Sequence, residues 1–334
     1  MPFRGSEDPG SEFLADPLER FFALEAALDQ NRSLFGDRVP LRFIAVNLVL
    51  TPGEPEELAG RVIALREGLD AHMSWLSQVE SSVRMLIASS LLKLGDSPAD
   101  FYEEVQRVRA TMSALGLRRS EIYQTLTILA LRSRNRLRPI ERDQVERVQE
   151  IYEAMKTHHW LLTGPEDLPA CAFLSFLPGT AAELGQRAAD IYQVLNQEAG
   201  LWKGDPLQTA SNVLALGQLE AAEIAGRFRR LAQAFRDAGV RVGQTSYDEV
   251  ALLCFLARPV ERIVETVIEY RDRIGAELGW AEKSLAFGLG ANLAFVRLVG
   301  NDPELGPLAD AKSLLDMQSI VDARAAAAGA AGAA

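Results

Sequence analysis

Small polar side chains recur at one position in a series of short apolar segments, and their types and spacing suggest a binding wall. Alternate members of this column lie 79 to 85 residues apart. The column consists of Asn47, Ser90, Thr127, Ser175, Asn212, Cys254 and Asn292. Amide groups can bind peptide backbone or a polar ligand, so Asn47, Asn212 and Asn292 are candidate binding residues. We favour the alternative that only small side chains fit where helices cross, because a thiol replaces the amide at Cys254.

Two tyrosines and a histidine in the charge-rich segments between these stretches are further candidates. Tyr152 and Tyr192 lie in similar settings, EIYEAM and DIYQVL. A ring buried at a helix-packing edge with its hydroxyl in water is the simpler interpretation of both. His158 belongs to the stretch HHWLLTGP, the least regular junction of the chain. Adjacent histidines point apart on a helix, and neither a third nitrogen ligand nor a nucleophile stands nearby, so we predict no metal site and no general base there.

The four tryptophans, Trp75, Trp160, Trp202 and Trp280, fall at or near the ends of the charge-rich segments. We interpret them as wedges between repeats. If they were exposed together on one rim, they would instead be anchors for a partner. Trp160, beside the histidines, is retained as a candidate binding residue.

The one basic region spans residues 118–142 and contains seven arginines and two glutamates, in a chain of 334 residues with a net charge of −11. Its candidate binding residues are Arg134 and Arg136. A solvated surface is the simpler interpretation, and a dock for an acidic partner or a phosphate is the alternative. Nucleic-acid affinity comes mainly from Lys and Arg neutralising phosphates, so the acidic chain is not expected to bind nucleic acid.

Motifs for nucleotide, zinc and nucleophilic chemistry are absent from the sequence, which has no GxxxxGK[ST], HExxH, CxxC or GxSxG pattern. We therefore predict no catalytic residues, no metal and no cofactor. Two cysteines cannot form a disulfide framework and fit a reducing compartment. The sequence has no uninterrupted apolar run near 18 residues and no signal-peptide pattern, so we expect a cytoplasmic protein without a membrane span.

The elements that carry these residues repeat with a period near forty. Short apolar segments begin at residues 39, 81, 120, 166, 205, 245 and 282, in steps of 42, 39, 46, 39, 40 and 37. Each is followed by a longer segment with apolar residues on one helical face, as at Val145, Val148, Ile151, Tyr152 and Met155. Thr180 and Glu183 form the pattern of a capping box. Glycines at 116, 200, 239 and 279 are predicted left-handed helix ends.

The period predicts an all-α fold, an α-solenoid of about seven antiparallel helical hairpins that resembles HEAT or tetratricopeptide arrays. Helices near residues 17–35 and 307–326 are predicted to cap its two ends. We assign residues 14–322 to one helical-repeat domain. Residues 1–13 (including GSEF) suggest a cloning remnant or disorder, and residues 323–334 form an Ala/Gly-rich tail.

The stretch HHWLLTGPEDLPACAFLSF, followed by ADIYQVLNQEAGLWKGDPLQTASNVLALG, resembles an uncharacterised bacterial family, domain-of-unknown-function family 4003. The similarity covers most of residues 17–300, and the HW-LTGP-D segment is its most specific part. This resemblance implies a soluble, mostly helical bacterial protein. It brings no catalytic residue to this chain.

Two functions fit these observations. The first is a non-catalytic binding or scaffold protein that receives a protein or peptide partner on its curved surface. The alternative is an all-helical enzyme, or a protein that binds a small apolar ligand in a central pocket. An open superhelix favours the first, whereas a closed ring with Asn47, Asn212, Asn292 and carboxylates converging on a deep cavity favours the second. Either function is compatible with a homodimer.

Overall fold

The computed structural model describes residues 16–30, 38–72, 81–117, 120–158, 163–217, 219–299, 308–309 and 311–321. Within these ranges the regular structure is helical and contains no strand, which confirms the all-α prediction. The longer helices are α1 (Pro17–Asp29), α3 (Pro55–His72), α5 (Pro98–Ala114), α7 (Arg142–His158), α9 (Ala181–Gln197), α11 (Ala221–Asp237) and α13 (Val260–Glu277). They alternate with α2 (Val39–Leu48), α4 (Ser81–Leu94), α6 (Glu121–Arg134), α8 (Leu168–Leu174), α10 (Asp205–Ala215), α12 (Tyr247–Leu253) and α14 (Leu285–Val299). Short 3-10 turns, η3 (Pro165–Asp167), η4 (Gln244–Ser246) and η5 (Trp280–Glu282), precede α8, α12 and α14.

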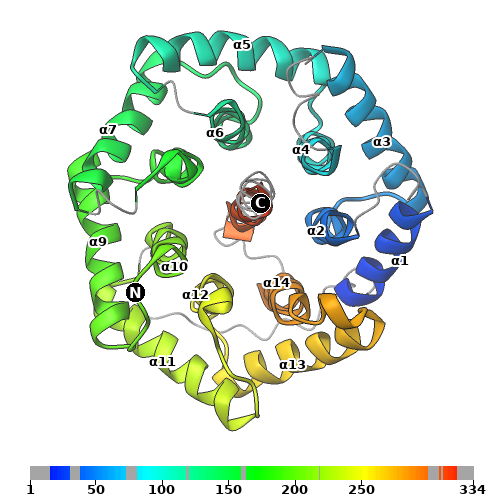
Figure 1. The fold of residues 1–334 in the computed structure, drawn as a ribbon, viewed down its shortest axis with the longest axis vertical. Helices are drawn as coiled ribbons and strands as arrows, with labels where there is room; N and C mark the ends of the chain where they lie inside the picture. Colours follow the sequence, from blue (N-terminus) through cyan, green and yellow to red (C-terminus); the bar gives the residue numbers. More distant parts are fainter. Residues whose placement is uncertain are drawn as a thin grey trace, which may run out of the picture.

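The helices form two concentric rings around a central helix (Figure 1). The odd-numbered helices make the outer ring, and the even-numbered helices stand inside it. Residues 311–321 are also helical and run through the middle. We name residues 308–309 and 311–321 the central helix. The architecture is therefore a closed α/α ring filled by a segment of the same chain.

The ring is closed, which decides between the open and closed arrangements that the sequence left open and differs from the predicted solenoid with a capping helix at each end. The Tyr270 hydroxyl on α13 donates to Asp16 Oδ1 at 2.5 Å, and Arg273 pairs with Glu19 on α1. Helix α14 packs against both α1 and α2. The N-terminal helix is thus a member of the outer ring, between α13 and α3, and not a cap on a free end. The C-terminal segment, predicted as the second cap, lies at the centre instead, because a closed ring has no end to cover.

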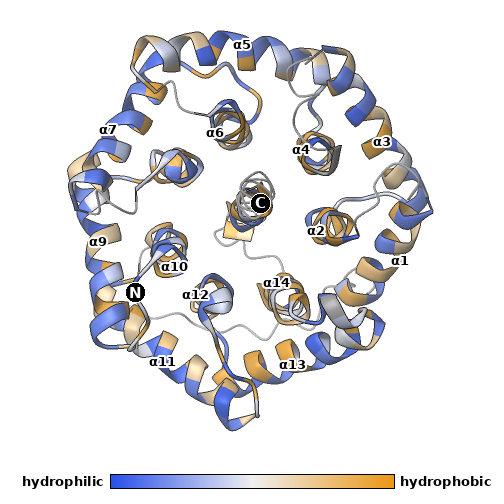
Figure 2. Ribbon diagram, in the orientation of Figure 1, coloured by the Kyte–Doolittle hydropathy of each residue, from blue (hydrophilic) through white to orange (hydrophobic). Residues whose placement is uncertain are grey.

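The inner helices begin at or within a few residues of the seven segment starts identified in the sequence. They are apolar on all sides because outer helices, neighbouring inner helices and the central helix surround them. Every residue of α8 is buried. The outer helices have one wet face, and in α7 the buried residues are Val145, Val148, Ile151, Tyr152 and Met155, as predicted. Figure 2 shows these outer helices as alternating hydrophilic and hydrophobic ribbon.

The predicted boundary signals hold with one exception. The Thr180 hydroxyl accepts from the Glu183 backbone N–H at 3.2 Å, and the Glu183 carboxylate accepts from the Thr180 N–H at 2.7 Å, which completes the capping box. Three of the four predicted glycines are left-handed, with φ of 84°, 72° and 79° at residues 116, 200 and 239. Gly279 has φ −60° because the chain enters η5 there instead.

Arginines on outer helices hold the turn that follows an inner helix, a role that was not predicted from the sequence. Arg187 on α9 donates to the carbonyls of Ala215, Gly217 and Leu219 at 3.4, 2.8 and 2.8 Å, just past the end of α10. Arg20, Arg147 and Arg227 make equivalent bonds in other repeats, and Arg107 donates to the Ile140 carbonyl further along the connection that follows α6. Terminal helix carbonyls have no partner within the helix, so a guanidinium fork satisfies them and joins the two layers. None of the described helices is long and apolar enough to cross a membrane.

Candidate functional site

The centre of the ring contains a buried cluster of charged side chains. Lys312, on the central helix, is only 1% exposed. Its ammonium contacts the Asp316 carboxylate one turn further along the same helix. It also lies 3.1 Å from Asp248 Oδ2 and 3.9 Å from Glu249 Oε1, at the start of α12. The wall of the ring thus binds the central helix through a specific side chain as well as through apolar packing.

Two asparagines of the sequence column meet the central helix beside this cluster. Asn292 on α14 donates to Asp316 Oδ2 at 3.3 Å. Ser313 donates its hydroxyl to Asn47 Oδ1 on α2 at 3.0 Å, and Asn47 donates to Ser89 Oγ on α4 at 3.0 Å. Polar contacts therefore reach the central helix from three inner helices, α2, α12 and α14.

Three carboxylates surround one ammonium in this cluster. Burial opposes the charged form of Lys312, but the neighbouring carboxylates outweigh it and raise the lysine pKa. Burial raises the pKa of Glu249, and the Asp248 charge raises it further. Burial likewise raises the pKa of Asp316, to about 6. For Asp248 burial acts in the same direction, but the Lys312 charge outweighs it and lowers the pKa. The cluster itself thus contains three carboxylates and one ammonium, and Lys93 lines the adjoining cavity.

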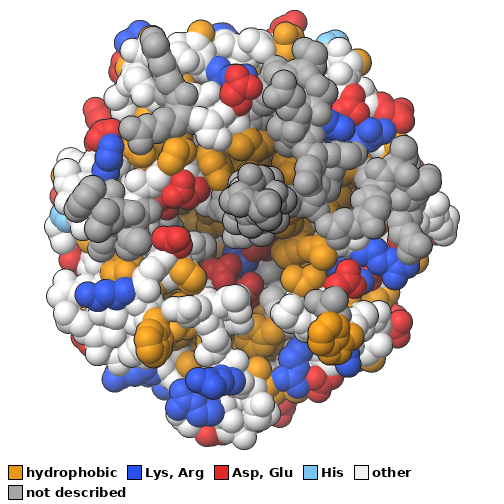
Figure 3. All heavy atoms as spheres, viewed as in Figure 1, with side chains coloured by type: hydrophobic (Ala, Val, Ile, Leu, Met, Phe, Trp, Pro, Cys, Tyr) orange, Lys and Arg blue, Asp and Glu red, His pale blue; other side chains and the backbone are white. Residues whose placement is uncertain are grey.

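The same carboxylates are the metal-binding donor set of the described residues. Oxygens of Asp248, Glu249 and Asp316 lie within 4.8 Å of one another. The Lys312 ammonium occupies the space among them, so a metal ion would have to displace it. As it stands, the arrangement is an anchor for a cationic side chain. On the face viewed in Figure 3, acidic and hydrophobic side chains gather around the middle of the ring.

Little open space remains beside the anchor. A cavity of about 30 Å³ lies among α2, α14 and the central helix, lined in part by Asn47, Asn292, Ser313 and Asp316, with Lys93 on its wall. This volume is about that of one water molecule. Among the described residues, the central helix occupies the middle of the ring, where the small-molecule hypothesis placed a pocket.

Asn212 lies in a second buried cluster, around Asp167. Asn212 and Gln208 on α10 donate to the two carboxylate oxygens at 3.0 and 2.9 Å, and the Gly164 backbone N–H donates at 3.1 Å. Burial raises the Asp167 pKa to about 7, although the three hydrogen bonds oppose the shift. The cluster ties the irregular HHWLLTGPEDLP junction to the next inner helix. The three candidate asparagines do not all converge on one cavity.

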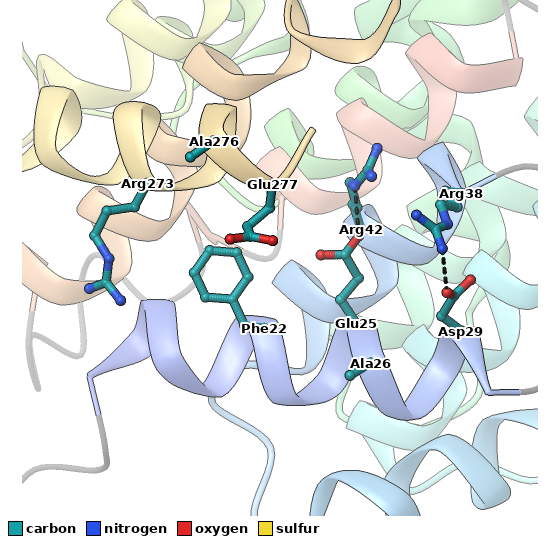
Figure 4. Close-up of a pocket in the computed structure, with 9 residues that line it drawn as sticks. All are labelled: Phe22, Glu25, Ala26, Asp29, Arg38, Arg42, Arg273, Ala276 and Glu277. Atoms are coloured by element: carbon teal, nitrogen blue, oxygen red, sulfur yellow. Dashed lines mark hydrogen bonds and ion pairs between the residues drawn. The ribbon is translucent and has the colours of Figure 1, made fainter. Parts of the chain in front are cut away.

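A surface pocket of about 580 Å³ lies at the seam of the ring, between α1, α2 and α13 (Figure 4). Phe22 and Glu277 face each other across its middle. Arg38 pairs with Asp29 at 2.7 Å, and the buried Arg42 pairs with Glu25 at 2.8 Å. These guanidiniums are already neutralised by carboxylates, so the pocket presents no excess charge toward a ligand of one sign.

The remaining candidates do not gather into a site. The Tyr152 ring and hydroxyl are both buried, whereas we expected the hydroxyl to face water. The Tyr192 hydroxyl accepts a hydrogen bond from the Gly204 N–H at 3.1 Å. His158 is exposed at the end of α7, and Trp160 lies outside the described residues. Arg134 stacks on Phe176, with its guanidinium carbon 5.4 Å from the ring centroid, and Arg136 is exposed.

The wedge interpretation of the tryptophans is wrong for the two that the structure describes. Trp202 is 75% exposed and Trp280 is 89% exposed. Both lie on junctions that lead from an outer helix to an inner one, where the chain turns at the ring surface and no neighbouring repeat covers the side chain.

Comparison with known proteins places the chain in a family. A family model described as "Protein of unknown function (DUF4003)" matches residues 41–325, a range that includes the central helix. This chain belongs to the DUF4003 family. A curated relative, "Uncharacterized protein YeaA" of Bacillus subtilis (strain 168), is 23% identical over 236 residues, which is 70% of each chain. No solved structure matches the chain.

Sequence reasoning missed the residues that form the anchor in this DUF4003 member. Asp248 and Glu249 stand next to an apolar segment and look like an ordinary acidic first turn of a helix. Lys312 and Asp316 look like a surface i, i+4 pair. One signal was present: Lys312, one of only five lysines in the chain, and Asp316 stand one turn apart among apolar residues such as Leu314. A lysine and an aspartate in such a setting are compatible with a buried ion pair.

Proposed function

We propose that the chain is a non-catalytic binding protein whose ring receives an α-helix of a protein or peptide through its centre. The central helix is the occupant that the chain itself supplies. The observation that carries the proposal is the burial of Lys312 against Asp248 and Glu249. A helix that only filled space would need no charged side chain at position 312. In this proposal the curved surface that receives the partner is the inner wall of the ring.

The ring has its own means of staying closed when the helix leaves. Tyr270–Asp16 and Arg273–Glu19 join its two ends on the outer side, and α14 packs against α2 on the inner side. None of these contacts includes the central helix. Release of the central helix would therefore open the centre without breaking the contacts that close the ring.

The character of the interface also supports exchange. Apart from the apolar residues, the central helix meets the wall through a serine, a lysine and an aspartate, and the wall offers asparagine and carboxylate groups. Interfaces that form and dissociate are more polar than permanent ones, because their surfaces must also be compatible with water. The small-molecule alternative has no comparable support, given a central cavity of about 30 Å³.

A displaced-helix experiment tests the proposal. Met317 on the central helix is buried, so Met317→Asp would place an unpaired charge in the apolar centre and expel the helix. Ser319 is exposed on the same helix, and Ser319→Asp is the matched control. A fluorescent peptide with the sequence of residues 308–321 should bind the Met317→Asp chain and neither the wild-type chain nor the control, as measured by anisotropy.

Two results would refute the proposal. One is a folded Met317→Asp chain that does not bind the peptide. The other is a Met317→Asp chain that loses its whole fold, by far-UV circular dichroism, under conditions in which the control stays native. In that case the central helix would be permanent core. Hydrogen exchange of the wild-type chain gives an independent answer, because an exchangeable helix should lose protection at residues 311–321 before α13 and α14 do.

A further inference from the structure

Charge at the anchor is out of balance, and the excess comes from the chain's own helix. The wall supplies two carboxylates, Asp248 and Glu249, and the central helix brings one ammonium together with a third carboxylate, Asp316. Asp316 is buried within the cluster and accepts a hydrogen bond from Asn292. A lysine-bearing helix without that carboxylate would complement the wall better than the resident helix does.

We propose that the ring is built to receive a helix of a partner protein that presents a lysine to Asp248 and Glu249 and carries a neutral residue one turn later. The resident helix is then a weaker placeholder, which a better-matched partner displaces. This inference rests on the proposed function, since it names the partner class of the same site. Charge complementarity selects the partner, because the wall presents carboxylates where the lysine enters and the neutral groups of Asn47 and Asn292 where it hydrogen-bonds to the helix elsewhere.

Lysine fits this position better than arginine. The ammonium is compact and meets carboxylates from α12 and from its own helix turn at once. A guanidinium is larger and planar, and prefers a two-pronged contact with a single carboxylate. The site therefore favours lysine through the geometry of its charge contacts.

The unfavourable environment of Asp316 supports the placeholder role. Burial raises the pKa of this carboxyl to about 6, so near neutral pH the docked helix keeps a charge that its surroundings disfavour. Asparagine at this position could still accept a hydrogen bond from Asn292 through its carbonyl oxygen. It would remove the charge and keep the shape, so it is the substitution that isolates the effect.

A peptide panel on the Met317→Asp chain tests the inference. The probes are labelled 14-residue peptides with the sequence of residues 308–321, unchanged or carrying Asp316→Asn, Lys312→Arg or Lys312→Gln, with Ser319→Ala as the control. We expect Asp316→Asn to bind about tenfold more tightly at pH 8 and Lys312→Gln about a hundredfold more weakly. Lys312→Arg should fall between the unchanged peptide and Lys312→Gln, and the control should equal the unchanged peptide.

The outcomes separate the two proposals. Failure of the unchanged peptide to bind would refute the proposed function itself. If it binds, but Asp316→Asn binds equally or more weakly, or Lys312→Gln binds equally, the partner inference is wrong and the helix receptor stands. Adding Asp248→Asn to the Met317→Asp chain should shrink the difference between the unchanged and Lys312→Gln peptides, which a loss of packing alone would not do.

The competing occupant is the central helix of a second copy of this chain. Sedimentation velocity of the wild-type chain distinguishes a partner protein from a second copy as the occupant. The Met317→Asp chain is the comparison, because its central helix cannot dock in another ring. A monomeric wild-type chain whose own helix is displaced by the Asp316→Asn peptide supports a partner protein. A wild-type dimer that the Met317→Asp substitution abolishes would overturn the assignment in favour of exchange between copies.

Discussion

Replacing Lys312 by methionine tests the anchor most directly, because it keeps the length of the side chain and removes its charge. Two unit charges 4 Å apart attract by about 4 kcal/mol at an effective dielectric constant of 20. Lys312 has wall carboxylates at 3.1 and 3.9 Å and a third within its own helix. Removal of one partner of a buried ion pair typically costs about 3–5 kcal/mol, since the other charge stays buried without compensation. We expect a loss of that size at pH 8.

The loss should depend on pH with a defined sign. A carboxyl whose pKa is raised in the folded state stabilises that state when protonated, and this stabilisation disappears as the pH rises through the raised value. Asp316 has such a pKa, about 6, and Glu249 is shifted in the same direction. Removing the ammonium raises both further. At pH 5 the carboxyls of the variant are therefore protonated, and the deficit should shrink to about 1–2 kcal/mol, the cost of the lost hydrogen bonds.

The measurement is urea denaturation at pH 5 and pH 8, followed by far-UV circular dichroism, with hydrogen exchange at residues 311–321 to detect release of the helix alone. Lys203→Met, at an exposed position, is the control and should change stability by less than about 0.5 kcal/mol. A Lys312→Met chain within about 1 kcal/mol of the wild type at pH 8, or with the same deficit at both pH values, would show that Lys312 is not a buried anchor.

Three further substitutions probe the fold around the site. Arg187→Ala should destabilise the chain by about 2–3 kcal/mol in urea denaturation, because three carbonyls at the end of α10 lose a charged donor, whereas the exposed Arg229→Ala should have little effect. Burial raises the pKa of Asp167 to about 7 in the folded state, so the stability of the wild-type chain should fall as the pH rises from 4 to 7. In Asp167→Asn, the midpoint of urea denaturation should fall less over the same pH range, because the contribution of Asp167 is absent. Gly290→Ala should lower the melting temperature, since its Cβ would lie 2.8 Å from the Arg271 backbone nitrogen, while Gly60→Ala, with open space around it, should raise the melting temperature through helix propensity.

The helix positions could be predicted from the sequence because each depends on local signals. The apolar stretches, the Thr180 capping box and the left-handed glycines act over a few residues, and the structure shows all of them except a left-handed Gly279. An arginine column was equally readable and was overlooked: Arg107, Arg147, Arg187 and Arg227 stand forty residues apart. That exact spacing places one guanidinium in each of four successive repeats.

Closure of the ring could not be read in the same way. The hydrogen bond between Tyr270 and Asp16 spans 254 residues, and neither residue type marks a seam. Whether a series of hairpins closes depends on the small rotation between neighbours, which is summed over all repeats. Packing details such as the approach of Gly290 to the Arg271 backbone set that rotation. A periodic sequence therefore defines the unit without defining the angle between units.

The buried charge at the centre is a reason to look for function, because it is a poor means of obtaining stability. Replacing a buried ion pair with well-packed apolar residues is often neutral or stabilising by about 1–4 kcal/mol. A leucine at position 312 facing apolar residues at 248 and 249 would fill the ring at least as well as the present cluster. Under the proposed function, the charges would disfavour a helix that lacks a cation at the matching position, since its docking would leave Asp248 buried without its ammonium partner. Selection among occupants has a use only if occupants exchange. Under the proposed exchange, the surplus carboxylate of Asp316 would make the resident helix easier to displace than a helix that lacks it.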